Sequence, residues 1–481
     1  MSLAAAASRG VFVTLGGQWT KFVIQIAALT VLARLLVPDD YGKLAMIMAV
    51  VGIATVIGDF GLSLAAIQSQ NLDDVQRSNL FWWNAAIGTA AAALVFTVAG
   101  PISQFYGEPG LRPATQALSV VFLLNGLAAQ FRAELSRAFG FVRLASADVA
   151  GQASGLVVAI VLAINGAGFW ALVAQQITIA LSGLVITAGS ARWLPGLPHR
   201  SPGMTHFAKF GLATTATQAV NYVSSNVDSV VIGRLWGAEQ LGIYNRAFQI
   251  FMLPIQQIAA PITRVALPVL SRLTDDAQYL RYVGQAQLTL AYPATIGLAI
   301  LAANAEPIIQ VVLGAKWLQA APILEVLAIG GVFQVFGYVY YWIFLSKSRM
   351  PILFACEVVG RALLVAAVII AAPFGPFWVA CAFSFGLFVV WSITSVFGLR
   401  RVNVSAKRLI AIAARPGALA VAVYLACKIS AEAVIDTNAI VRLAVAFASI
   451  SLVLGAAMLF KTVRNDLRQI FIALRIPKGT P

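Results

Sequence analysis

Charged side chains are scarce in this sequence. Only 11% of its 481 residues are Asp, Glu, Lys or Arg, whereas 60% are hydrophobic. A soluble globular domain carries about a quarter of its residues as charges, which cover its surface. The composition therefore excludes a soluble domain and indicates a chain whose surface faces lipid.

Histidine and cysteine are also rare, which excludes several kinds of site. The histidines His199 and His206 lie in a Pro- and Gly-rich segment, and the cysteines Cys356, Cys381 and Cys427 fall inside apolar runs. The sequence has no paired-cysteine zinc pattern, no phosphate-binding glycine loop and no nucleophile elbow. The loops are too short for a soluble catalytic domain. We therefore expect no enzyme activity, no catalytic residues, no metal and no cofactor.

Long apolar runs recur throughout the chain, each sufficient to cross a hydrocarbon core of about 30 Å as a helix. The runs are continuous rather than alternating, which favours helices over barrel strands. Gly, Pro and charged residues between them predict an all-α polytopic membrane protein with about fourteen transmembrane helices. The expected ranges are 11–36, 42–68, 79–104, 114–137, 144–164, 168–190, 207–235, 240–269, 280–304, 319–345, 351–372, 375–399, 409–428 and 438–460.

The distribution of positive charge predicts the orientation. An even number of helices puts both termini on one side, and most of the 33 lysines and arginines fall on that side. The positive-inside rule then places both termini in the cytoplasm. The net charge of +15 reflects this topology and contact with anionic lipid headgroups, not nucleic acid. The end of the chain predicts a basic amphipathic helix at 461–476 on the inner leaflet.

One segment of the sequence occurs twice. The residues V-L-A-R-L-L-V-P-D-D-Y-G at 31–42 return as V-I-G-R-L-W-G-A-E-Q-L-G at 231–242. Each copy joins two long apolar runs, so we interpret the chain as two parallel six-helix repeats around a central cavity, with two extra C-terminal helices. The expected parts are an N-terminal lobe, a cytoplasmic linker, a C-terminal lobe, the additional helices and a basic tail, at 1–195, 196–206, 207–400, 401–460 and 461–481.

Polar residues form stripes on the first two predicted helices of each repeat. A charge at the centre of a bilayer costs about 3 kcal/mol, so these side chains need a reason to be there. Their spacing puts each set on one helical face, and the four faces occupy equivalent places in the repeats. This favours a water-filled cavity over stripes that only join helices. The residues expected to line it are Gln18, Lys21, Gln25, Asp59, Gln218, Asn221, Asp228, Gln256 and Arg264.

The predicted helix 240–269 carries Pro254 and Pro261 seven residues apart. Each proline removes a backbone donor, so this helix could bend as a gate, although a statically curved helix would show the same pattern.

Other charged residues within the predicted helices have simpler interpretations. Glu357 and Arg361 are spaced to neutralise each other on one helix. Arg132 near a helix end is interpreted as snorkelling, and Asp148 as lying near water.

Four stretches carry a family resemblance. They are L-A-R-L-L-V-P-D-D-Y-G at 32–42, G-D-F-G-L-S-L-A-A-I-Q at 58–68, F-A-K-F-G at 207–211, and N-V-D-S-V-V-I-G-R-L-W-G-A-E-Q-L-G-I-Y-N-R-A-F at 226–248. Through them the chain resembles the Wzx-type flippases of the multidrug/oligosaccharidyl-lipid/polysaccharide flippase superfamily, over roughly 5–400.

The resemblance implies a V-shaped transporter in the bacterial inner membrane. It would move undecaprenyl-diphosphate-linked oligosaccharide from the inner to the outer leaflet for O-antigen, exopolysaccharide or capsule synthesis. Cationic cavity residues would meet the diphosphate, and Lys21, Arg264 and Arg361 are the candidates. Membrane lipids would surround it, and a polysaccharide polymerase and chain-length machinery are the expected partners.

Four other functions remain as alternatives. A multidrug or metabolite exporter of the same superfamily would have fewer helices and rely on acidic residues, and a peptidoglycan-precursor flippase would match in helix number. A major-facilitator carrier would need a basic loop where this chain has S-Q-N-L-D-D-V-Q-R-S-N-L-F. A membrane-embedded polymerase would need a large extracytoplasmic loop, and every loop here is short.

Overall fold

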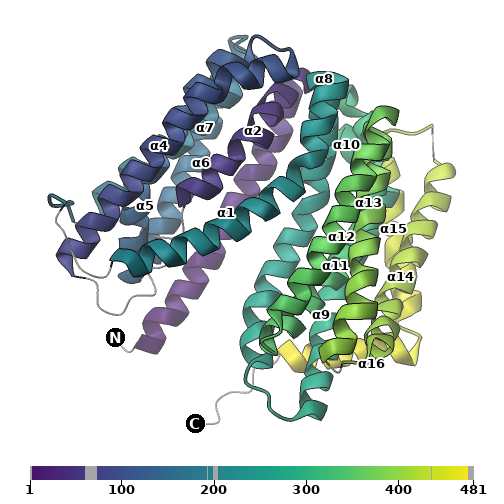
Figure 1. Cartoon of the computed structure of the whole chain (residues 1–481). Coiled ribbons are helices and arrows are strands. Elements are labelled where there is room, and N and C mark those ends of the chain that lie inside the picture. The colour runs from purple at the N-terminus through teal and green to yellow at the C-terminus, as the bar shows by residue number, and fades with distance from the viewer. Residues whose placement is uncertain are drawn as a thin grey trace. The chain divides into compact units, whose positions relative to one another are not determined.

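The computed structural model describes residues 3–59, 73–191, 193–198, 204–402, 404–434 and 436–474. Within these ranges, the side chains of 3–15, 56–59, 204–217, 219–221, 223–224 and 471–474 lie outside the description. All regular secondary structure in the described residues is helical (Figure 1). The prediction of an all-α protein is therefore confirmed.

The long helices follow the predicted apolar runs closely. The predicted breaks at 164–168 and 372–375 are confirmed, and glycines with positive φ stand in both. The α-helices are α1 Leu3–Leu35, α2 Pro38–Asp59, α4 Asp74–Tyr106, α5 Leu111–Arg137, α6 Phe141–Ile164, α7 Phe169–Ser190, α8 Met204–Leu270, α9 Asp276–Ala303, α10 Ala305–Val312, α11 Ala320–Ser346, α12 Met350–Ala371, α13 Pro376–Ile393, α14 Ala406–Glu432, α15 Ala439–Ala457 and α16 Lys461–Leu474.

Of the helices in the described residues, 11 are long and apolar enough to cross a membrane. The chain is therefore a multi-pass membrane protein. The α8 helix counts once among them, although Gly237 interrupts it with φ 80° and ψ −177°. Glycine adopts such a conformation without the strain that a Cβ would cause. The sequence predicts a boundary between two transmembrane helices at this point, and the predicted total stays a prediction.

Two short segments differ from the sequence expectation. The α10 helix follows α9 directly, at a place where the sequence predicts a loop. Its Ile309 is fully buried, so packing of one apolar face stabilises a helix too short for the hydropathy pattern to reveal. The predicted helix 375–399 ends earlier, because a π-turn at Thr394–Gly398 follows α13.

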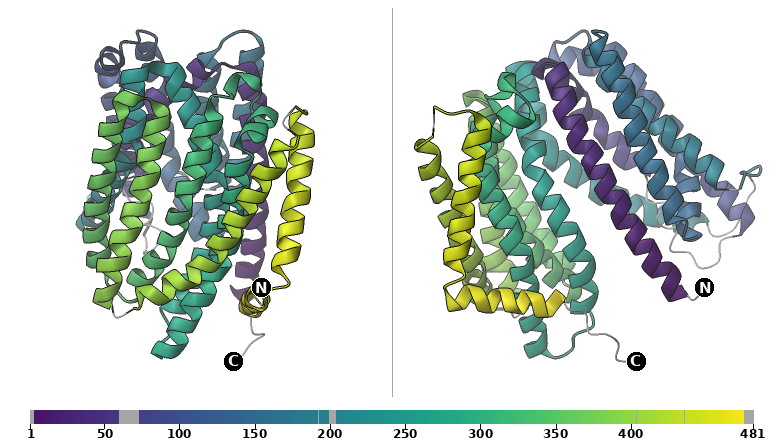
Figure 2. Two further views of the ribbon diagram at one scale, coloured as in Figure 1. Left: turned by 90° about the vertical axis from the view of Figure 1, so that its right-hand side faces the viewer. Right: turned by 180° about the vertical axis from the view of Figure 1, so that it is seen from behind.

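The chain divides into two compact units, Met1–Gly242 and Ile243–Pro481. In the first unit α4 packs along α5, and α6 packs along both α7 and α1. In the second unit α9 packs against α11 and α14, and α12 against α13. Figure 2 shows α14 and α15 side by side in the second unit, with α16 lying across its end. The lobe boundaries expected from the sequence stay a prediction.

The two copies of the repeated segment touch each other inside the first unit. A Cβ on Gly42 would lie 1.6 Å from the carbonyl oxygen of Ala238, and a Cβ on Gly242 would lie 1.9 Å from that of Pro38. Positions 38 and 42 correspond to 238 and 242 in the repeat, so the contact is reciprocal. A residue larger than glycine would force the two backbones apart at either position.

Candidate functional site

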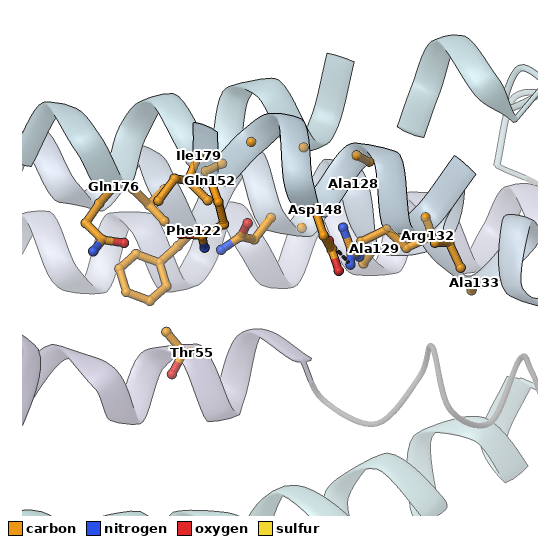
Figure 3. A pocket seen from close by; sticks show the side chains of 18 of the residues that line it. Thr55, Phe122, Ala128, Ala129, Arg132, Ala133, Asp148, Gln152, Gln176 and Ile179 are labelled. Atoms are coloured by element: carbon orange, nitrogen blue, oxygen red, sulfur yellow. Dashed lines mark hydrogen bonds and ion pairs between the residues drawn. The ribbon is translucent and has the colours of Figure 1, made fainter. Parts of the chain in front are cut away.

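The first unit contains a cavity of about 570 Å³. Five helices form its walls, namely α1, α2, α5, α6 and α7. Figure 3 shows side chains from α5, α6 and α7 gathered on one side of it, with Thr55 of α2 on the other. The polar residues that line the cavity are Lys21, Thr55, Asn125, Arg132, Ser136, Asp148, Gln152 and Gln176.

Helical periodicity explains why these side chains share one space. On α5 the lining residues Phe122, Asn125, Ala129 and Arg132 recur every three or four positions, so they share one helical face. The side chain of Leu118, one turn before Phe122, is buried at 1% exposure. The cavity therefore follows one stripe of α5 that runs from the apolar Phe122 past Arg132 to Ser136.

An ion pair crosses the cavity wall between α5 and α6. The Arg132 Nη2 atom donates to Asp148 Oδ1 at 2.7 Å, as the dashed line in Figure 3 shows. The two side chains are 41% and 35% exposed, so both are reached from the cavity. The sequence interpretation of Arg132 as snorkelling and of Asp148 as merely near water missed this pair.

Lys21 adds a second positive charge to the same cavity. Its helix α1 is held against α6 by a close contact, since a Cβ on Gly17 would lie 2.8 Å from the Cβ of Ala145. Among the residues that the structure describes, no carboxylate lies within ion-pair distance of the Lys21 amine. Lys21 thus places a cation among the polar residues that line the cavity.

The cavity combines these charges with amide side chains. Asn125, Gln152 and Gln176 come from three different helices and can each donate and accept hydrogen bonds. Phe122 and Ile179 give it apolar surface beside them. Two cations, one carboxylate and three amides suit an anion with several oxygens and attached hydroxyl groups. In the described part of the chain, no group of three His, Cys, Asp or Glu residues could hold a metal ion.

The sequence matches the family described as "Polysaccharide biosynthesis protein" over residues 31–322. The chain belongs to this family. It is 26% identical over 374 residues to the lipopolysaccharide biosynthesis protein WzxC of Escherichia coli strain K12, covering 74% of each chain. It is 27% identical over 312 residues to the succinoglycan biosynthesis transport protein ExoT of Rhizobium meliloti strain 1021, covering 64% of this chain and 63% of that one. The predicted relationship to Wzx-type proteins is confirmed.

A solved structure shows the fold of this polysaccharide biosynthesis protein. The lipid II flippase MurJ, in its inward closed conformation, superposes with a TM-score of 0.70 at 14% sequence identity, over 93% of this chain and 99% of that one. At such low identity the likeness shows the fold alone. The predicted fold class, an all-α polytopic membrane protein, is confirmed.

The other predicted cavity residues of the first unit are placed as follows. Gln18 and Gln25 lie on α1, exposed and half-buried, outside the lining of this cavity. Asp228 is 5% exposed and its carboxylate accepts the Ser229 backbone N–H at 2.7 Å. Gln218 is exposed. The side chains of Asp59 and Asn221 lie outside the described residues.

In the second unit, Gln256 and Arg264 are exposed on α8. The predicted pair is present on α12, where the Arg361 Nε atom donates to Glu357 Oε2 at 2.7 Å. Pro254 and Pro261 lie inside α8. The roles of these residues in a shared cavity, in diphosphate binding and in gating stay predictions.

Proposed function

We propose that this polysaccharide biosynthesis protein flips undecaprenyl-diphosphate-linked oligosaccharide from the inner to the outer leaflet of the bacterial inner membrane. Family membership and the relatives named for lipopolysaccharide and succinoglycan biosynthesis support this substrate class. The observation that carries the proposal is the cavity of the first unit, which presents Lys21 and Arg132 inside a multi-pass membrane protein.

The physical argument concerns the diphosphate. Moving its charges away from water without partners would cost several kcal/mol, so a carrier must supply cations along the route. Lys21 offers a compact charge on a flexible stem, and Arg132 offers a planar fork of donors that matches phosphate oxygens. The amides of Asn125, Gln152 and Gln176 would bind sugar hydroxyl groups.

The proposed cycle alternates access to the cavity from the two sides of the membrane while the polyprenyl chain stays in lipid. Arg264 would help to capture the diphosphate at the cytoplasmic mouth, and α8 would bend near Pro254 and Pro261 as the protein changes state. Asp59 or Asp228 would neutralise Lys21 as the ligand is released, in a state of the cycle other than the one described above. Arg361 is the weakest candidate, because it pairs with Glu357 and, unlike Arg132, does not line the cavity of the first unit.

The topology and partners belong to the same proposal. Both termini would lie in the cytoplasm, and the protein would work beside a polymerase and chain-length machinery. The cycle forms and breaks no covalent bond, so the protein would act as a transporter and not as an enzyme.

The test is complementation of a bacterial strain that lacks its own oligosaccharide flippase. Wild-type protein should restore surface glycan, whereas Lys21→Gln and Arg132→Gln should lose export and accumulate lipid-linked repeat units in the membrane. Arg143→Gln is the matched control, because Arg143 is exposed on α6 and donates to the Ser190 carbonyl at 3.2 Å, outside the cavity. Normal export by both cavity variants, at wild-type levels of membrane protein, would contradict the proposed site.

A further inference from the structure

We propose that Asp148 sets the ligand selectivity of the cavity. It holds Arg132 while the cavity is empty, and it gives up the guanidinium more readily as the negative charge of the ligand increases. This inference rests on the proposed function and adds a specificity-determining residue to it. The occupant it selects is a diphosphate ester rather than a monophosphate ester or a free monovalent anion.

The geometry of the pair allows such an exchange. Asp148 contacts Arg132 through a single oxygen and a single nitrogen, Oδ1 and Nη2, at 2.7 Å. A guanidinium group has five N–H donors, and the other donors of Arg132 contact no acceptor in the described residues. Both side chains face the cavity and come from different helices. The Arg132 side chain can therefore rotate from Asp148 toward a ligand without any change in the backbone of α5 or α6.

The electrostatics favour a ligand with several charges. The described side chains that line the cavity include two cations, Lys21 and Arg132, and one anion, Asp148. Coulomb attraction at a fixed distance grows in proportion to the charge of the ligand. A monovalent anion offers Arg132 no more than the carboxylate already does. A diphosphate offers more charge, a bidentate match to the fork and a second oxygen cluster for Lys21.

A purely structural role for the pair is the competing explanation. Ion pairs exposed to this degree contribute little to folding, because solvent screens them and long side chains lose freedom in forming them. The α6 helix is already held by its packing along α7 and α1. If the role were purely structural, replacing Asp148 would leave the preference between ligands unchanged. The ratio of the affinities for a diphosphate and for a monophosphate therefore distinguishes the two explanations.

The experiment measures binding to the purified full-length protein in detergent by calorimetry. The probes are farnesyl diphosphate and farnesyl phosphate, which share one lipid chain and differ in charge. Wild-type protein should bind the diphosphate at least about tenfold more tightly. Asp148→Asn and Asp148→Ser should raise affinity for the monophosphate about tenfold and for the diphosphate less, so that the preference falls. Asp148→Glu should restore the wild-type preference.

Asp74→Asn is the matched control, since Asp74 pairs with Arg77 at 3.3 Å at the start of α4, outside the cavity. An unchanged ratio in both Asp148→Asn and Asp148→Ser would overturn this inference. If Arg132→Gln also weakens diphosphate binding in that case, the proposed function stands and only the selectivity role fails. If wild-type protein binds neither probe and does not restore export, the proposed function fails as well.

Discussion

Each unit of the protein contains a cavity of about 570 Å³, and the two cavities have opposite chemistry. The cavity of the first unit is lined by Lys21, Arg132 and Asp148 together with amides. The cavity of the second unit lies among α9, α11, α13 and α14, and its lining consists of Leu, Ala, Ile, Val, Phe, Gly, Trp and Tyr residues. The two cavities therefore have equal volumes, but one is lined with charged and amide side chains and the other with apolar and aromatic ones.

The charges of the second unit serve a different purpose. Asp466 of α16 accepts hydrogen bonds from Tyr292 at 3.0 Å and from Arg415 at 2.9 Å. Glu325 of α11 accepts from Lys428 of α14 at 2.8 Å. These contacts link α16 to α9 and α14, and α11 to α14. The comparison teaches that the ion pairs of Asp466 and Glu325 join helices in the second unit, whereas the pair of Arg132 with Asp148 faces the cavity of the first.

Among the variants that test this comparison, we expect Asp466→Ala to lower the free energy of unfolding the most. Asp466 is 1% exposed, so its removal would leave the Arg415 charge and the Tyr292 hydroxyl without their acceptor. We expect a loss of about 3 kcal/mol in the free energy of unfolding, mostly from the buried Tyr292 hydroxyl, because Arg415 is 44% exposed and can be hydrated. Thermal unfolding of the purified protein measures it, with the exposed Asp436→Ala as control. Equal unfolding temperatures for the two variants would show that the second unit does not depend on its buried charge.

A somewhat smaller loss is expected from Gly42→Ala and from Gly242→Ala, which test how the first unit is stabilised. The added Cβ atoms would lie 1.6 and 1.9 Å from backbone oxygens, so we expect each variant to lose about 1–3 kcal/mol of stability. The double variant should lose less than the sum, because one separation of the two backbones relieves both clashes. Gly100→Ala is the control, because a Cβ there would meet nothing within 4 Å. Strict additivity would contradict a shared contact.

The sequence was sufficient for most of the long helices of both units and for their separations, but not for α10. Apolar length and glycine punctuation locate the ends of α6 and α7 closely, because in lipid each backbone must satisfy its own hydrogen bonds. The break at Gly237 was predictable for the same reason, since it separates two apolar runs. These features depend on local sequence and on the membrane, which a single chain reveals.

The cavity was only partly predictable. Lys21 was identified because a lysine within an apolar run requires an explanation. The partnership of Arg132 with Asp148 was missed, because it depends on which faces of α5 and α6 meet and not on the pattern of either helix. The sequence did contain one signal for this ion pair, because Arg132 lies near the end of one helix and Asp148 near the start of the next. The reciprocal contact of Gly42 and Gly242 likewise required the packed structure.

A modest effect is expected from Glu325→Gln. Glu325 accepts from Lys428 and, at 2.6 Å, from Tyr424, but the side chains of the ion pair are 27% and 39% exposed. We therefore expect a loss of about 1 kcal/mol, clearly less than for Asp466→Ala. Urea unfolding followed by tryptophan fluorescence would rank the two variants. A loss as large as that of Asp466→Ala would mean that burial does not determine how strongly these charges stabilise the second unit.

The smallest effect on stability, and the sharpest test of the comparison, is expected from Arg132→Gln. Its ion pair with Asp148 resembles those of the second unit in distance, at 2.7 Å, but it faces a cavity instead of a helix interface. We expect the free energy of unfolding to change by no more than about 0.5 kcal/mol, because exposed pairs add little to folding. Glycan export should nevertheless be lost. Export is measured by complementation, and stability is measured on protein purified from the same cells, beside Asp466→Ala, which should show reduced stability. If Arg132→Gln unfolds as early as Asp466→Ala does, the pair belongs to the packing of the first unit, and the two units use charge in the same way.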